Sequence, residues 1–291
     1  MSGNELNELG VFLRNRREAL SPARAGLPAG PRRRAPGLRR SEVAMLAGVS
    51  VEYITRLEQG RDRRPSPQVV AALAHALQLT AHERAHFYKL SKAADTGQAC
   101  MAAAMVRHSA RPPVQALLDR MDATPAALFN RLSDVVACTA AYRRLMEPLG
   151  LFESAPANLA RFVFTDPRAR AAYPDWEHVA DEQAATLKHG PFRANPQMAM
   201  LVDELAGTAG EAFARRVRTL PGLPQPNGVL RLIHPGAGEL RLAFETLDLP
   251  ADDDQRLMVY LPADAAASAA LDDLERRGAP ALRLVAGSRT G

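Results

Sequence analysis

The chain has 291 residues, of which 47% are hydrophobic and 24% charged, enough apolar material for one large globular domain or two ordinary ones. Its apolar runs fall short of the roughly 18 residues that a membrane span needs, which excludes an integral membrane protein. The polar start has no apolar export-signal core, and Cys100 and Cys138 are the only cysteines. The sequence therefore predicts a cytoplasmic protein with free thiols.

The formal net charge of +5 is unevenly distributed along the chain. Residues 1–95 contain 16 Lys and Arg against 9 Asp and Glu, whereas residues 96–291 contain 21 against 23. Arginine supplies most of the early charge, and its guanidinium pairs bidentately with phosphate and with guanine. The first third thus predicts a nucleic-acid partner; the alternative is that genomic base composition favours arginine, since lysine is scarce throughout.

Residues 1–92 are predicted to form a mainly α-helical domain of short helices separated by turn signals. A loop rich in Pro, Gly and Arg at Pro22–Gly37 is long enough to suggest a functional or mobile segment. Gly48 is placed to close the second helix in a left-handed conformation. The expected helices are Leu9–Leu20, Ser41–Ala47, Val51–Gln59, Pro67–Leu77 and Ala81–Lys92.

The pattern changes after residue 92. Residues 93–113 are Ala-rich and weakly patterned and end at Pro112-Pro113, so we interpret them as a linker. Residues 114–291 mix helical patterns, from about 140 to 220, with alternating apolar and polar residues. An antiparallel sheet interrupted by helices predicts an α+β domain. Its expected strands are 127–130, 134–139, 229–234, 239–245 and 256–261, the third and fourth forming a hairpin around Pro-Gly-Ala-Gly.

The segment from Gly48 to Gly60 has the features of a recognition helix. Ser50 is a good N-cap, and Val49 before it can pack on Ile54. At about 100° per residue, Tyr53, Ile54 and Leu57 share one side of the helix. The opposite side carries Val51, Glu52, Thr55, Arg56 and Gln59. Two short helices joined by a Gly-containing turn, the second with an exposed polar face, form a helix-turn-helix that fits the major groove.

Residues 38–60, LRRSEVAMLAGVSVEYITRLEQG, resemble the helix-turn-helix of Xre-type repressors. Together with further motifs, they make the chain similar to the MmyB-like transcriptional regulators over about residues 9–261. That resemblance implies a five-helix DNA-binding domain joined to a PAS-like domain that binds a fatty acid or another small apolar ligand. The further motifs are LGVFLRNRRE from Leu9, PSP from Pro65, NLARFVF from Asn158, YPDWE from Tyr173, HPGAGEL from His234 and QRLMVY from Gln255.

By position, the resemblance places Val51, Glu52 and Arg56 at base contacts and Arg40 and Ser50 at phosphate contacts. Arg56, long and forked, is the best candidate for guanine. Val51 can offer only apolar contact, and Arg39 stands where relatives place a Ser or Thr cap. The other DNA-binding candidates are Thr55, Arg61, Arg63, Arg64 and, as an arm on the backbone or in the minor groove, Arg32, Arg33 and Arg34. The alternative for the last three is a solvated loop.

The sequence His82-Glu83-Arg84-Ala85-His86 matches the H-E-x-x-H pattern of zinc proteases. Thr80 and Glu83, however, fit a capping box that gives Glu83 a structural task. A third ligand pattern does not follow, and no nucleophile elbow or dinucleotide loop occurs. We therefore predict neither a metal nor a cofactor nor an enzyme activity, and a zinc hydrolase is the least favoured alternative.

In residues 114–291 the ligand-binding candidates lie in family-like motifs: Arg161, which can pair with a carboxylate, Tyr173, Trp176 and His234. Residues 136–139 and 215–218 depart from relatives by lacking their Trp residues, which puts the pocket shape in doubt. The whole sequence predicts a DNA-binding transcriptional regulator that acts as a homodimer on symmetric half-sites and responds to a ligand. The alternative is a constitutive DNA-binding regulator whose second domain only dimerises.

Overall fold

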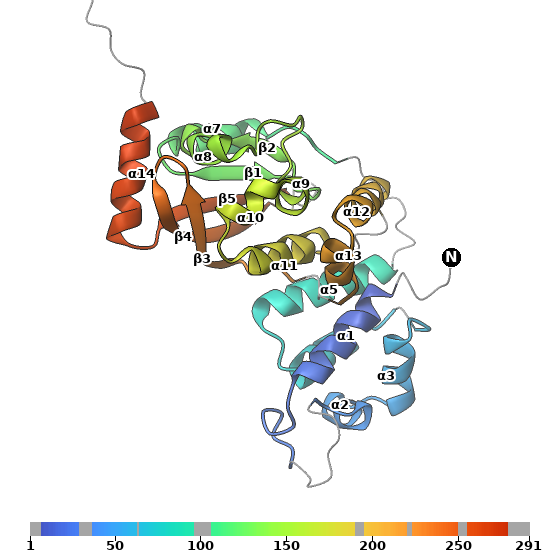
Figure 1. The fold of residues 1–291 in the computed structure, drawn as a ribbon. Coiled ribbons are helices and arrows are strands. Elements are labelled where there is room, and N and C mark those ends of the chain that lie inside the picture. Colours follow the sequence, from blue (N-terminus) through green and yellow to red (C-terminus); the bar gives the residue numbers. More distant parts are fainter. Residues whose placement is uncertain are drawn as a thin grey trace, which may run out of the picture. The chain divides into compact units, whose positions relative to one another are not determined.

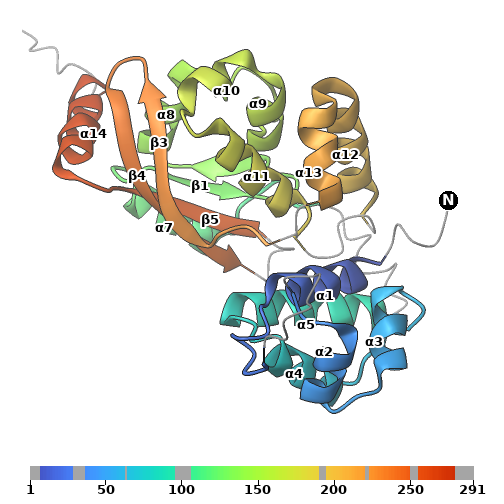
Figure 2. The ribbon, with the colours of Figure 1, turned by 60° about the horizontal axis from the view of Figure 1, so that its bottom comes forward.

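The computed structural model describes residues 7–28, 37–62, 64–95, 106–189, 195–219, 223–249 and 255–278. The chain divides into two compact units, the first made of Met1–Val106 and Glu177–Gln225 and the second of Arg107–Trp176 and Pro226–Gly291 (Figures 1 and 2). Residues 177–225, assigned from sequence to the second domain, thus group with the N-terminal helices. The domain boundaries 1–92, 93–113 and 114–291 stay a prediction.

The first unit contains the five expected N-terminal helices, which are confirmed to within a few residues. They are α1 (Glu8–Ala19), α2 (Arg40–Ala47), α3 (Val51–Glu58), α4 (Pro67–Ala76) and α5 (Ala81–Asp95). Their apolar faces meet in one core that includes Phe12, Leu57, Leu73 and Phe87. The burial of such side chains stabilises helices that are individually too short to persist in water.

Residues 177–225 add three helices to this unit: α11 (Trp176–Leu187), α12 (Pro196–Ala209) and α13 (Glu211–Thr219). Arg216 of α13 is buried and is ion-paired with Glu177 and Asp181 of α11. Because a buried guanidinium requires charged partners, these two carboxylates explain how an arginine fits at this position.

The second unit contains a five-stranded antiparallel sheet in the order β2-β1-β5-β4-β3. All five predicted strands are confirmed, and β4 extends four residues past its predicted end. The strands are β1 (Ala126–Phe129), β2 (Val135–Cys138), β3 (Asn227–His234), β4 (Gly238–Leu249) and β5 (Gln255–Pro262). The expected hairpin joins β3 to β4, where His234 pairs with Gly238.

This unit also contains α8 (Ala140–Met146), a short 3₁₀ helix at Glu147–Leu149, α9 (Leu159–Thr165) and α10 (Pro167–Ala172). Two further helices were not predicted from the sequence. The first is α7 (Pro112–Arg120), which begins at the proline pair interpreted as a break. Proline is well suited to the first helical turn, because the backbone N–H groups there have no acceptor within the helix. Val114 and Leu118 of α7 share a buried cluster with β1 and β5. The second is α14 (Ala265–Gly278). Among the described helices, none is long and apolar enough to cross a membrane.

Candidate nucleic-acid interface and ligand-binding domain

The turn between α2 and α3 has the predicted backbone geometry. Gly48 has a φ of +65°, the left-handed conformation that ends α2 without steric cost, and the Val49 N–H donates to the Ala44 carbonyl at 3.0 Å. Arg39 is the N-cap of α2, and the Glu42 carboxylate accepts its backbone N–H at 2.6 Å. Glu42 thus supplies one half of a capping box, whereas Arg39 makes no side-chain cap bond to the first turn.

The start of α3 is fixed by Ser50, whose hydroxyl accepts the Tyr53 N–H at 3.1 Å. Ile54 and Leu57 are buried in the helical core, as predicted. The other side of the helix is exposed at Val51, Glu52, Arg56 and Gln59 and half-buried at Thr55. The sequence-derived division of α3 into a packing face and an outward face is thus confirmed.

Arg56, on the outward face of α3, makes only weak contacts with its neighbours. The Arg56 guanidinium lies 5.6 Å from the centroid of the Tyr53 ring and 3.9 Å from the Asp62 carboxylate, with half of its side chain exposed. Thr55 donates its hydroxyl hydrogen to the Val51 carbonyl at 2.9 Å, so this donor is occupied within the helix. Arg56 therefore has donors to offer to a base edge, whereas Thr55 has mainly acceptor capacity.

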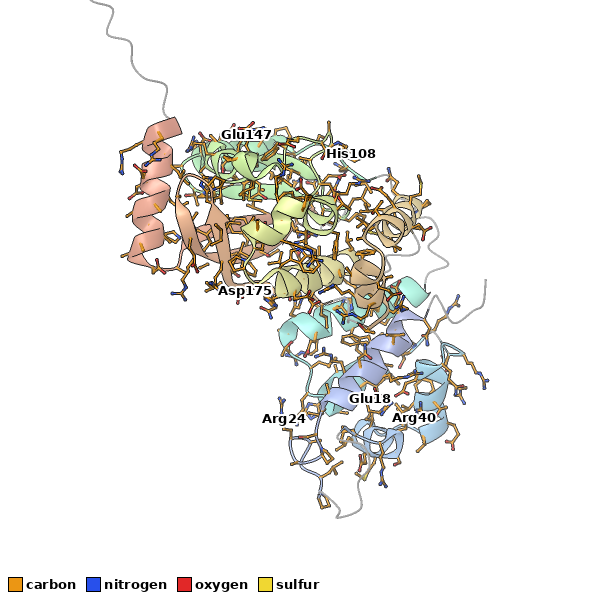
Figure 3. All side chains as sticks on the ribbon, in the orientation of Figure 1. Glu18, Arg24, Arg40, His108, Glu147 and Asp175 are labelled. Atoms are coloured by element: carbon orange, nitrogen blue, oxygen red, sulfur yellow. The ribbon has the colours of Figure 1, made fainter. Side chains whose placement is uncertain are left out.

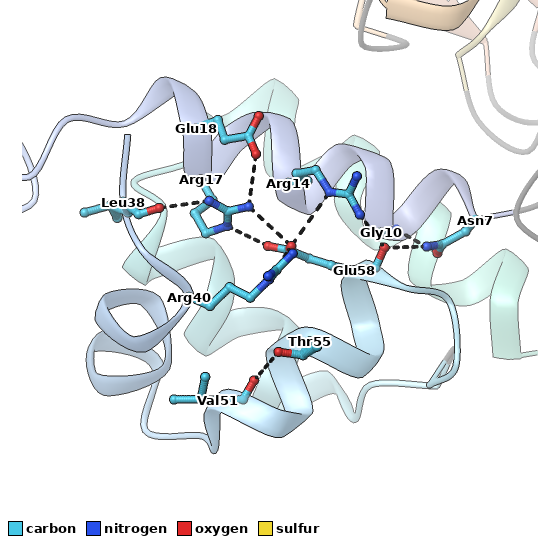
Figure 4. Close-up of polar contacts among 10 residues, drawn as sticks. All are labelled: Asn7, Gly10, Arg14, Arg17, Glu18, Leu38, Arg40, Val51, Thr55 and Glu58. Atoms are coloured by element: carbon cyan, nitrogen blue, oxygen red, sulfur yellow. Dashed lines mark hydrogen bonds and ion pairs between the residues drawn. The ribbon is translucent and has the colours of Figure 1, made fainter. Parts of the chain in front are cut away.

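A buried carboxylate missed in the sequence analysis organises the arginines beside α3. The Glu58 side chain is 1% exposed and accepts from the Arg17 Nε at 2.6 Å and the Arg40 Nε at 2.8 Å, with the Arg14 Nε 3.8 Å away (Figure 4). Figure 3 labels Arg40 and Glu18 of this region on the whole ribbon. The carboxylates of Glu58 and Glu18 raise the pKa of Arg17, although burial alone acts in the opposite direction. The Glu58 cluster, made of Glu58, Arg14, Arg17 and Arg40, keeps excess positive charge.

One sequence signal could have revealed this cluster. Glu58 follows Ile54 by four residues, which places a carboxylate on the buried side of an amphipathic helix. Asn7 contacts the backbone of Glu58: it caps α1 by accepting the Gly10 N–H at 3.0 Å, and its side-chain amide donates to the Glu58 carbonyl at 2.8 Å (Figure 4). This bond ties the start of α1 to the end of α3.

The remaining DNA-binding candidates lie around the end of α3. Arg61 is exposed, and its N–H donates to the Arg56 carbonyl at 2.9 Å, so it directly follows the recognition helix. Arg64 is also exposed. Arg40 is 40% exposed despite its bond to Glu58. Arg32, Arg33, Arg34 and Arg63 lie outside the described residues.

The capping box predicted at the start of α5 is confirmed. The Glu83 carboxylate accepts the Thr80 N–H at 2.7 Å, and the Thr80 hydroxyl accepts the Glu83 N–H at 3.3 Å. The same carboxylate is ion-paired with Arg16 of α1. Glu83 is thus bound in two structural contacts.

The two histidines of the H-E-x-x-H segment lie beside a third that the sequence analysis missed. The His189 ring stacks on His86 with centroids 4.9 Å apart and on His82 at 5.9 Å. Burial lowers the pKa of His86 to about 3, and the nearby His189, His82, Lys89 and Arg16 act in the same direction. In the described part of the chain, no three His, Cys, Asp or Glu residues are grouped so as to hold a metal ion.

Three of the four ligand-binding candidates gather around α9. Arg161 belongs to this helix, and the Tyr173 ring lies 6.4 Å from that of Phe162. Trp176 donates its indole N–H to the Val163 carbonyl at 2.9 Å, so its polar atom has a structural partner. Tyr173 and Trp176 are both buried.

His234 lies elsewhere, at the hairpin turn between β3 and β4. Its Nδ1 accepts the Gly236 N–H at 3.0 Å. Its Nε2 is buried without a hydrogen-bond partner among the described residues. Burial lowers the pKa of His234, which favours the neutral imidazole, and a contact with the Arg144 backbone partly opposes this shift.

The helix-turn-helix with its outward polar face defines a class of protein, a DNA-binding transcription regulator that carries a second, α+β unit. Residues 8–87 match the family model of a helix-turn-helix domain, and residues 110–274 match that of the MmyB-like transcription regulator ligand binding domain. The second match alone covers more than half of the chain. The chain therefore belongs to the MmyB-like transcription regulators. No curated protein matches it.

Proposed function

We propose that this regulator is a cytoplasmic homodimer that reads a specific operator through α3 and holds a fatty acid or another small apolar ligand in a PAS-like second domain. The observation that carries the DNA-reading part is the division of α3 into a core face, with Ile54 and Leu57 buried, and an exposed face that bears Arg56. A short helix presented in this way fits the major groove.

Three residues of the outward face have chemically distinct roles in this proposal. Arg56 donates two hydrogen bonds to the O6 and N7 of a guanine, Glu52 accepts from a cytosine amino group, and Val51 contacts a thymine methyl group. Arg40 and Ser50 contact phosphates that fix the helix in register. We propose a DNA-contacting role also for Thr55, Arg61 and Arg64 and, from their sequence alone, for Arg32, Arg33, Arg34 and Arg63.

The dimer follows from the size of the recognition element. One short helix reads only a few base pairs, so affinity and specificity require a second copy. Two copies related by a twofold axis place their recognition helices about 34 Å apart, the repeat of one turn of DNA. We therefore propose a pseudo-palindromic operator.

The ligand couples to DNA binding if it binds one arrangement of the two DNA-binding heads better than another. The proposed ligand-binding side chains are Arg161, Tyr173, Trp176 and His234. Tyr173 and Trp176 supply buried aromatic surface near α9, which suits an apolar molecule.

Selection of bound sites from random double-stranded DNA with the full-length protein tests this function. We expect enrichment of one palindromic sequence, which then binds the protein as two copies of the chain per duplex. Recovery of unrelated sequences would contradict specific reading by α3. A second measurement repeats operator binding in the presence of a fatty acid that binds the protein. Unchanged operator affinity would favour a constitutive regulator whose second domain only dimerises.

A further inference from the structure

Arg256 occupies an unusual position on β5 of the second unit. It shares one face of the sheet with Met258 and Tyr260, because alternate residues of a strand point to the same side. It pairs in register with Phe129 of β1 and Asp248 of β4. The Arg256 guanidinium lies 5.6 Å from the centroid of the Phe129 ring. The cation is therefore held against an aromatic surface.

The hydrogen bonding of this guanidinium is incomplete. It has five N–H donors, and within the described residues its one hydrogen bond goes to the Ser133 hydroxyl, at 3.0 Å. Among those residues no carboxylate lies within ion-pair distance of it. Arg256 is half-buried, and desolvation lowers its pKa to about 10 against the opposing charge of Asp248. A cation in such surroundings is costly unless an anion joins it.

Two tyrosines whose hydroxyl groups make few hydrogen bonds lie beside Arg256 on the same face of the sheet. The Tyr142 ring stacks on Tyr260 with centroids 5.8 Å apart and meets Phe129 edge to face at 6.2 Å. The Tyr142 hydroxyl is buried with no hydrogen-bond partner in the described chain. The Tyr260 hydroxyl contacts only the Met258 sulfur, at 3.9 Å, among described partners. Apolar rings thus continue from the cation along β5.

We infer that Arg256 and Ser133 bind the carboxylate of an aliphatic acid whose chain runs along Met258 toward the Tyr142–Tyr260 pair. A guanidinium with free donors forms two parallel hydrogen bonds to a carboxylate, and the aromatic rings cover the hydrocarbon. This inference rests on the proposed ligand-binding function and names the head group that the site recognises. It assigns that recognition to Arg256 and not to Arg161.

Calorimetric titration of delipidated full-length protein with tetradecanoate and with tetradecanol tests the inference. The acid is expected to bind at least about tenfold more tightly than the alcohol, the value of a hydrogen bond to a charged group. Arg256→Met should bind the acid about tenfold more weakly than the unmodified protein does, while its affinity for the alcohol should change less than about threefold. Arg256→Lys, which keeps the charge but not the fork, should fall between them.

Arg241→Met is the matched control, because Arg241 is an exposed arginine of the same sheet that is ion-paired with Asp264 at 3.3 Å. It should bind both probes as the unmodified protein does. Thermal unfolding of each variant without ligand checks the fold. If Arg256→Met keeps the preference for the acid, or if Arg161→Met abolishes it instead, the inference is overturned. If neither probe binds the unmodified protein, the proposed lipid ligand falls, and this inference with it.

Discussion

At the scale of single residues, Arg56 carries the reading of DNA. Its guanidinium is held only by a long ion pair to Asp62 and by the face of the Tyr53 ring, so little is lost when it turns to a guanine. Arg56→Ala should cost about 1–3 kcal/mol of binding free energy on the selected operator and relax the preference at one base pair. Anisotropy titrations of labelled operator variants measure both effects. Unchanged affinity and preference would remove Arg56 from the reading role.

Glu58 is expected to matter for folding because three arginines depend on one buried carboxylate. Glu58→Gln should lower the free energy of unfolding by about 3 kcal/mol, since it leaves the largely buried Arg17 without its counter-charge. Glu18→Gln is the control: Glu18 pairs with Arg17 at 3.1 Å but is largely exposed, so less than about 1 kcal/mol should be lost. Urea unfolding measures both variants, and equal effects would contradict a central role for Glu58.

His86 makes stability depend on pH. Its pKa is about 3 in the folded protein against an ordinary value of 6.5, so the unfolded chain binds this proton more readily. The resulting contribution to stability is present above about pH 6.5 and is lost as the pH falls toward 3. From pH 7 to pH 5 this residue should account for a loss of about 2 kcal/mol.

Urea unfolding of His86→Phe at the two pH values measures this loss. The variant places an aromatic ring beside Phe12, whose ring centroid is 5.2 Å from that of His86, and removes the titrating group. The difference in unfolding free energy between pH 7 and pH 5 should therefore be smaller in the variant. An equal difference in both proteins would show that His86 does not titrate as described.

At the scale of elements, the cap of α3 links stability to DNA binding. Ser50→Ala removes the hydroxyl that accepts the Tyr53 N–H and should cost about 1 kcal/mol of stability. It also removes a proposed phosphate contact. Ser66→Ala removes the equivalent cap of α4, where the hydroxyl accepts the Val69 N–H at 3.3 Å. Thermal unfolding should show similar losses of stability in Ser50→Ala and Ser66→Ala. Anisotropy titrations should show weaker operator binding only for Ser50→Ala. Equal operator affinities of the two variants would contradict the phosphate contact of Ser50.

Helices and strands with a clear period were predictable from sequence, because apolar residues recur at the spacing that each element buries. The hairpin of β3 and β4 and the start of α3 at Ser50 are examples. Helix α7 was missed because Pro112-Pro113 was interpreted as a break, although proline also starts helices. Helix α14 lies beyond the last strong β pattern in an Ala-rich segment and was not recognised.

At the scale of the whole molecule, what the sequence did not reveal comes from residues brought together by tertiary packing. Glu58 meets Arg17 and Arg40 from two other helices, and His189 meets His86 from about one hundred positions away. A local pattern does not reveal the partners in either encounter, although the spacing from Ile54 places Glu58 on the buried side of α3. The outward face of α3 could be predicted because a single amphipathic helix defines it, whereas Arg256 stands out only once its neighbours on β1 and β4 are known.

The account depends on the outward face of α3 being the surface that operator DNA covers. Backbone amide hydrogen exchange of the full-length protein, with and without the selected operator, addresses this most directly. We expect the largest operator-dependent protection over residues 50–56, with weaker protection around Arg40. Protection confined to other segments, with exchange of residues 50–56 unchanged at saturating operator, would contradict DNA reading by α3.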